Sequence, residues 1–207
     1  QGENVKTFED MFSNYLGVKY SVATSSGTTA LQMALLANNI GKGDEVITTG
    51  FTFVATVNSI LSVGAKPVLV DIDTFTNNID ETLIEKYITK NTKAIMPVHL
   101  YGLSCNMDEI VNIAEKYNLI IIEDACQSLG AEFNNVKVGR FGVGCFSFYP
   151  TKNITTGEGG MVCTDDDDVY EKLQLIRNHG MGQSRYDYIA LGFNFRMTDI
   201  QAAIGNI

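Results

Sequence analysis

The sequence has no excess of positive charge and no long apolar run, and each absence excludes a class of protein. Lys and Arg number 15 against 24 Asp and Glu, which gives a net charge of −9. This balance argues against a nucleic-acid or anionic-membrane surface, because both select for clustered Lys and Arg. No uninterrupted apolar run approaches the ~18 residues that a membrane-spanning helix needs. We therefore expect a globular protein that binds neither nucleic acid nor membranes.

Paired cysteines are absent too. The four cysteines (Cys105, Cys126, Cys145 and Cys163) form no C-x-x-C pair, which argues against a zinc site. Scattered cysteines in an acidic sequence are typical of reduced thiols, so we expect a cytoplasmic protein whose cysteines are small buried side chains. The aspartate run at 165–168 could suggest a metal site, but an acidic first helical turn is the favoured interpretation, and we expect no metal.

Segments with strand and helix patterns alternate along the chain. The expected strands cover residues 20–24, 44–49, 66–72, 93–100 and 119–124, with shorter pieces at 145–150 and 159–164. The expected helices cover residues 5–16, 25–38, 51–64, 79–88, 106–118 and 165–180. This alternation predicts an α/β fold with a mostly parallel central sheet and helices on both faces. Ligands of such sheets bind at the carboxyl ends of the strands, so residues that follow strands are the first candidates for a site.

The first such candidate is the turn "SSGTT" at residues 25–29, between a strand and a helix. Backbone N–H groups at a helix start, together with the helix dipole, bind anions and typically phosphate. The turn is neither a P-loop nor a dinucleotide fingerprint, because the glycine and lysine spacings of both are missing. Taken alone, the turn is a modest signal, and an ordinary capped helix start is the favoured interpretation.

Two further candidates are Asp124, which ends the apolar strand "LIIIED", and Lys152, within "FSFYPTKNITTGEGG". A carboxylate at the end of a buried strand must be paired or functional. The lysine is either a solvent-facing loop residue or an amine that attacks a carbonyl. With the "SSGTT" turn, the two match the needs of pyridoxal 5'-phosphate (PLP), which are a lysine for the aldehyde, an acid for the pyridine nitrogen and a helix start for the phosphate. Phe51 or Phe53 could cover its ring.

Longer motifs occur in a fixed order over essentially the whole chain. They are "YLGVKYSVATSSGTTALQMAL", "GDEVITTGFTFVATVNSI", "PVHLYG", "IIEDACQSLGA", "FSFYPTKNITTGEGGMV", "RNHG" and "LGFNFRMTDIQAAIG". In these motifs and their order the sequence resembles the sugar aminotransferases of the DegT/DnrJ/EryC1/StrS type, which have the fold-type I architecture of aspartate aminotransferase. The resemblance implies that residues 1–207 are the PLP-binding large domain, with the family's own start and its smaller C-terminal domain outside the chain.

The resemblance also implies catalytic and ring-binding residues. Lys152 would form the Schiff base with PLP and move the proton, and Asp124 would bind the pyridine nitrogen. Gln127 would contact the side of the ring that carries the phenolic oxygen, and Phe53 would stack on the ring. Some relatives are dehydratases that have histidine at the lysine position, so Lys152 favours transamination.

The remaining implied contacts concern the phosphate. Gly27 and Thr28 would bind it through backbone amides and a hydroxyl, and Ser147 would add a hydrogen bond. Asn194 resembles the residue that reaches the phosphate of a neighbouring subunit, which implies a homodimer with shared active sites. His99 and His179 lie in family motifs, and we expect them to be structural rather than catalytic.

The activity that the resemblance implies is PLP-dependent transfer of an amino group, with glutamate as the expected donor, to a nucleotide-linked keto sugar. Such reactions belong to surface-polysaccharide or deoxyaminosugar biosynthesis. Three alternatives stay open: a PLP-dependent sugar dehydratase, a sugar-nucleotide dehydrogenase or epimerase on a dinucleotide fold, and a non-catalytic cofactor-binding regulator or fragment. The second requires a glycine fingerprint after the first strand, and "SSGTT" is not one.

Overall fold

The structure is a computed structural model that describes residues 2–182, 184 and 186–207. Its strands are β1 (Tyr20–Thr24), β2 (Glu45–Thr49), β3 (Lys66–Val70), β4 (Thr92–Ile95), β5 (Ile120–Asp124), β6 (Glu132–Phe133), β7 (Val136–Lys137), β8 (Val143–Ser147) and β9 (Gly160–Thr164). Its helices are α1 (Glu3–Leu16), α2 (Gly27–Ala37), α3 (Ala55–Ser62), α4 (Glu81–Ile84), α5 (Met107–Tyr117), α6 (Asp167–Arg177) and α7 (Asp199–Gly205). Two short 3-10 helices are η1 (Glu85–Tyr87) and η2 (Leu100–Gly102).

The main sheet has the strand order β1-β9-β8-β5-β4-β2-β3. Neighbouring strands from β8 through β3 run parallel, whereas β9 is antiparallel to both of its neighbours, β1 and β8. The predicted α/β fold with a mostly parallel sheet is therefore confirmed. Because β9 alone runs against the other six strands, the loop from β8 to β9 lies at the carboxyl edge of the parallel strands.

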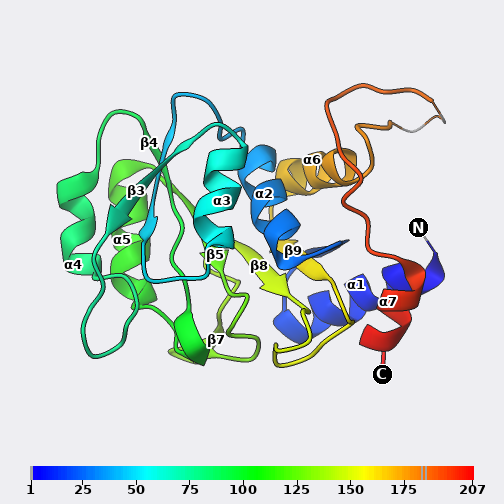
Figure 1. Cartoon of the computed structure of the whole chain (residues 1–207), viewed down its shortest axis with the longest axis horizontal. Coiled ribbons are helices and arrows are strands. Elements are labelled where there is room, and N and C mark those ends of the chain that lie inside the picture. Colours follow the sequence, from blue (N-terminus) through cyan, green and yellow to red (C-terminus); the bar gives the residue numbers. More distant parts are fainter. Residues whose placement is uncertain (1, 183, 185) are drawn as a thin grey trace.

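Helices cover both faces of this sheet (Figure 1). Successive strand residues point to opposite faces, so Val22 and Ile122 pack with α2, α3 and α6. Their neighbours Ala23 and Ile121 face the other side, where α1 and α7 cover one half of the sheet and α4 and α5 the other. Near-continuous apolar strands are what a sheet buried on both faces requires.

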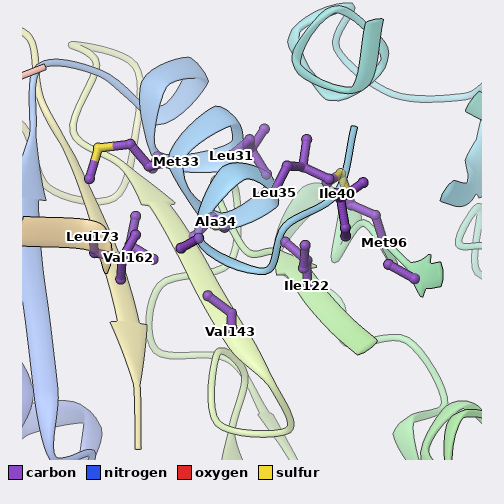
Figure 2. Packing of buried hydrophobic residues seen from close by; sticks show 14 of the residues in the cluster. Leu31, Met33, Ala34, Leu35, Ile40, Met96, Ile122, Val143, Val162 and Leu173 are labelled. Carbon is purple, nitrogen blue, oxygen red and sulfur yellow. The ribbon is translucent and has the colours of Figure 1, made fainter. Parts of the chain in front are cut away.

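Helix α2 is the central helix of the larger core. Figure 2 shows Ala34 and Leu35 of α2 lying over the sheet, close to side chains that include Val162 and Ile122. A capping box fixes where this helix begins. The Ser26 hydroxyl accepts the backbone N–H of Thr29, and the Thr29 hydroxyl accepts that of Ser26. The helix therefore starts directly after the turn that follows β1.

Most expected elements are present, and the differences are local. The helix expected from residue 51 begins only at Ala55, because residues 51–54 form a turn before it. The helix expected over 79–88 is divided into α4 and η1, although Asp80 caps its start as predicted. Asp166 caps α6, which confirms the interpretation of the aspartate run as a helix start. Among the described residues, no helix is long and apolar enough to cross a bilayer.

Candidate functional site

A cavity of about 420 Å³ opens at the carboxyl edge of the sheet. Its walls come from the start of α2, the turn before α3, the end of β5 and the segment that follows β8. Of the eight residues to which the family resemblance assigns a catalytic or cofactor-binding role, seven line it: Gly27, Thr28, Phe53, Asp124, Gln127, Ser147 and Lys152. The structure thus brings together side chains from four segments that are far apart in the chain.

Asp124 lies in the wall of this cavity and is only 5% exposed. Its Oδ1 accepts the backbone N–H of Cys126 at 3.2 Å, and its Oδ2 accepts the hydroxyl of Thr56 at 2.7 Å. A carboxylate oxygen has two lone pairs, so both oxygens retain one for a further donor. The arrangement suits a carboxylate that receives a proton-bearing nitrogen from the cavity.

The preceding acid, Glu123, faces the opposite side of the sheet and is fully buried. Its carboxylate accepts the backbone N–H groups of Gly139 at 2.7 Å, Phe141 at 2.7 Å and Gly142 at 3.1 Å. Three such bonds compensate the charge that burial would otherwise penalise. The two acids of "LIIIED" therefore have different roles. Glu123 anchors the loop behind the sheet, and Asp124 lines the cavity.

His99 lies behind the cavity wall and supports the end of β5. Its Nδ1 accepts the backbone N–H of Cys105 at 3.1 Å, so the proton of the neutral ring is on Nε2, 3.1 Å from Glu123. Its own backbone N–H donates to the carbonyl of Asp124 at 3.1 Å, and its carbonyl accepts the hydroxyl of Ser128. His99 is fully buried and does not line the cavity.

The start of α2 forms a cradle that fits an anion. Among the described residues, no acceptor is recorded for the backbone N–H of Gly27 or Thr28, the first two residues of the helix. A Cβ at Gly27 would lie 2.6 Å from Cβ of Ser147 and 3.0 Å from Sγ of Cys126, so only glycine fits there. Free amides, a helix dipole and the Ser147 hydroxyl are the groups that bind a phosphate.

Lys152 enters the cavity from the loop between β8 and β9. It is half-buried, and its backbone N–H donates to the carbonyl of Tyr149 at 2.9 Å. Within the described part of the chain, no ion pair or hydrogen bond of its ammonium group is recorded, whereas Lys19, Lys66 and Lys116 are all paired with carboxylates. Its amine is therefore available to a ligand in the cavity.

Cys126 lines the same cavity, so the expectation of four fully buried cysteines holds only for the other three. Burial, and then the negative charge of Asp124, raise the pKa of the Cys126 thiol well above its usual value, while the charge of Lys152 lowers it. The thiol is therefore protonated at neutral pH and is a poor nucleophile.

Besides Cys126 and the apolar Leu31 and Ala55, the cavity is lined by six residues to which the sequence alone gave no individual role: Ser26, Thr52, Thr56, Tyr149, Thr151 and Glu158. Of these, Thr56 is the buried hydroxyl, and a buried hydroxyl requires a hydrogen-bond partner, but α3 also contains Asn58, Ser59 and Ser62, so the sequence did not distinguish it. The others lie in loops, where the sequence pattern does not show which side chains turn inward.

Phe53 stands at the mouth of the cavity with 67% of its surface exposed, so its ring is free to cover a ligand. The alternative stacking residue, Phe51, does not line this cavity. Gln127 lines it and accepts the backbone N–H of Tyr101 at 3.3 Å. Phe53 is therefore the better placed of the two aromatic candidates.

Asn194 is exposed and lies outside the cavity. Its segment forms a β-bridge with Asn178, and its neighbours Phe193 and Phe195 stack on one another with ring centroids 4.8 Å apart. His179 donates its backbone N–H to Phe193 and likewise lies outside the cavity. The role of Asn194 towards a neighbouring subunit stays a prediction.

Comparisons with known proteins agree with this geometry. The sequence profile of the DegT/DnrJ/EryC1/StrS aminotransferase family matches residues 1–207. A GDP-perosamine synthase of Caulobacter vibrioides is 50% identical over 206 residues, which cover 99% of this chain and 56% of that protein.

Two solved structures superpose closely on the fold. NtdA from Bacillus subtilis with bound cofactor PMP has a TM-score of 0.95 and 40% identity, and the match covers 100% of this chain and 47% of that one. A putative sugar aminotransferase from Streptococcus pneumoniae in its PLP form has a TM-score of 0.94 and 32% identity, with 99% and 58% covered. The chain thus spans about half the length of the relatives that it matches.

Proposed function

Since the chain belongs to the DegT/DnrJ/EryC1/StrS aminotransferase family, we propose that this protein is a PLP-dependent aminotransferase acting on a nucleotide-linked keto sugar. The observation that carries the proposal is that Lys152 and Asp124 line one cavity with the free amides at the start of α2. These are the amine, the carboxylate and the anion cradle that PLP requires. Residues 1–207 would form the large, cofactor-binding domain, and glutamate would be the amino donor.

Each wall of the cavity would hold a different part of PLP. Lys152 would bind the aldehyde, Asp124 the pyridine nitrogen and Gln127 the side with the phenolic oxygen. Phe53 would cover the ring. For the phosphate, Gly27 and Thr28 would supply amides and a hydroxyl, with Ser147 adding its own hydroxyl.

When bound, PLP would supply an electron sink for the carbon that loses its proton. The chain's residues would do the rest. Asp124, held as an acceptor on both oxygens, would keep the ring nitrogen protonated. The Nζ of Lys152, once freed by the incoming amino donor, would take the proton from the donor's α carbon and deliver it to the C4' carbon of the cofactor. A lysine at this position, rather than a histidine, favours amination over sugar dehydration.

The substrate class is supported by the relatives that act on nucleotide sugars, among them GDP-perosamine synthases. Amination of such sugars would place the protein in surface-polysaccharide or deoxyaminosugar biosynthesis.

We further propose a homodimer in which Asn194 of one subunit reaches the phosphate site of the other. Its exposed position on a segment bound to Ser25, next to the "SSGTT" turn, is compatible with that reach.

The full-length protein tests this function directly. With PLP, glutamate and GDP- or UDP-linked keto sugars, we expect an aminated sugar nucleotide together with 2-oxoglutarate, both measured by mass spectrometry. Binding of PLP without amination of any keto sugar would favour the regulator alternative. Loss of water from the sugar instead of amination would favour the dehydratase.

Replacement of Gly27 by alanine should weaken PLP binding about tenfold, which corresponds to ~1.4 kcal/mol. The new Cβ would meet Ser147 and Cys126 at 2.6–3.0 Å and push the start of α2 away from the phosphate. Pyridoxal, which lacks the phosphate, should lose much less affinity. Fluorescence titration of both compounds against the wild type measures the difference.

Gly41→Ala is the matched control, because a Cβ there would meet only the carbonyl of Val63, at an ordinary 3.5 Å. This variant should bind both compounds as the wild type does. Equal losses of PLP and pyridoxal in Gly27→Ala would contradict a phosphate cradle at this position.

A further inference from the structure

Two threonine hydroxyls form a series of hydrogen bonds that ends at the carboxylate of Asp124. The Oγ1 of Thr52 lies 2.8 Å from the Oγ1 of Thr56, which in turn donates to Oδ2 of Asp124 at 2.7 Å. Thr56 is 1% exposed and Asp124 is 5% exposed, so bulk water does not compete for the second bond. All three residues line the cavity, and Thr52 is the outer member of the series.

The direction of this series follows from counting protons. A threonine hydroxyl has one hydrogen, and a carboxylate is a stronger acceptor than a second hydroxyl. Thr56 therefore gives its hydrogen to Asp124, and Thr52 must be the donor in the bond between the two threonines. Asp124 consequently receives a donor on each oxygen, from Thr56 on one and from the Cys126 amide on the other.

The same threonines fix the turn that carries Phe53. The backbone N–H of Thr56 donates to the carbonyl of Phe53 at 3.1 Å, and the hydroxyl bond from Thr52 to Thr56 encloses the same turn. The turn leads into α3, which lies beside α2 on one face of the sheet (Figure 1). One pair of side chains thus ties the carboxylate to the aromatic residue at the mouth of the cavity.

We propose that Thr56, supported by Thr52, is a positioning residue that holds the Asp124 carboxylate in the orientation that binds the cofactor's ring nitrogen. This inference rests on the proposed function and adds to it a residue that does not itself touch the reacting atoms. Without the hydroxyl, Oδ2 of Asp124 has no protein donor among the described residues, and the carboxylate rotates about its side-chain bonds towards other donors. The ring nitrogen then meets a mobile acceptor instead of a fixed one.

The test compares Thr56→Val, which keeps the shape and loses the hydroxyl, with Thr56→Ser, which keeps the hydroxyl. In crystal structures of the full-length protein without cofactor, we expect the Asp124 carboxylate to turn in Thr56→Val and to stay in Thr56→Ser. In PLP titrations, we expect about tenfold weaker binding for Thr56→Val and affinity within about twofold of the wild type for Thr56→Ser. Thr52→Val should fall between them.

Ser59→Ala is the control, since Ser59 is an equally buried hydroxyl of α3 whose bond goes to the carbonyl of Thr56 and not to Asp124. It should leave the carboxylate and the PLP affinity unchanged. An unmoved carboxylate in Thr56→Val, a failure of serine to rescue, or an equal loss in Ser59→Ala overturns the inference. The cofactor-free structures decide the positioning role even if the wild type binds no PLP, which would instead overturn the proposed function.

Discussion

Alanine at position 152 is expected to remove covalent cofactor binding and to lower turnover by about 10²–10⁴-fold, the usual contribution of a positioned acid–base group. The reason is that Lys152 is the lysine that lines the cavity, and its amine has no recorded partner in the described part of the chain. Borohydride reduction followed by peptide mass spectrometry should find a pyridoxyl group on Lys152 of the wild type and none on the variant.

Two further variants separate the chemistry of Lys152 from its charge and from general effects. Lys152→Arg keeps the positive charge but cannot form the covalent bond, so it should be as inactive as the alanine variant. Lys90→Ala changes an exposed turn lysine that does not line the cavity and should behave as the wild type. A reducible adduct that persists in Lys152→Ala would refute the assignment.

The sequence placed Asp124 and the "SSGTT" turn at one site because both follow strands whose carboxyl ends share an edge. Their strands β5 and β1 end at the predicted residues, Asp124 and Thr24. The sequence also predicted short strand pieces before and after Lys152, although not that β9 would be inserted antiparallel between β1 and β8. The loop with Lys152 reaches the same edge because β8, which precedes it, runs parallel to β5, and this pairing depends on contacts between distant residues.

Other parts of the site could not be predicted for physical reasons. The apolar spacing of residues 51–64 is helical throughout, yet the first four residues form a turn that aims Phe53 at the cavity and joins Thr52 to Thr56. Side chains in such turns are positioned by individual hydrogen bonds, both local and to distant residues, and these leave no periodic signal. The predicted role of Asn194 has a different difficulty, because the phosphate site that it is expected to reach belongs to another subunit.

The largest loss of stability is expected from Arg177→Met, at about 3–5 kcal/mol. Arg177 closes α6 and is only 4% exposed. Its guanidinium donates to the carboxylate of Glu9 in α1, to the carbonyl of Ala23 in β1 at 3.2 Å and to the side chain of Gln174. Methionine would fill the space but leave Glu9, whose side chain is 15% exposed, without its cation. Urea unfolding of the full-length protein measures the change.

A double-mutant cycle shows whether the loss comes from the unpaired charge. Glu9→Gln alone should also destabilise strongly, since it leaves the guanidinium of Arg177 uncompensated. The double variant Glu9→Gln/Arg177→Met contains neither charge and should be more stable than the sum of the single losses predicts. Lys116→Met removes an exposed pair with Glu85 and should change stability far less. Equal effects of Arg177→Met and Lys116→Met would mean that the buried pair contributes no more than an exposed one, and that apolar packing alone joins α1, β1 and α6.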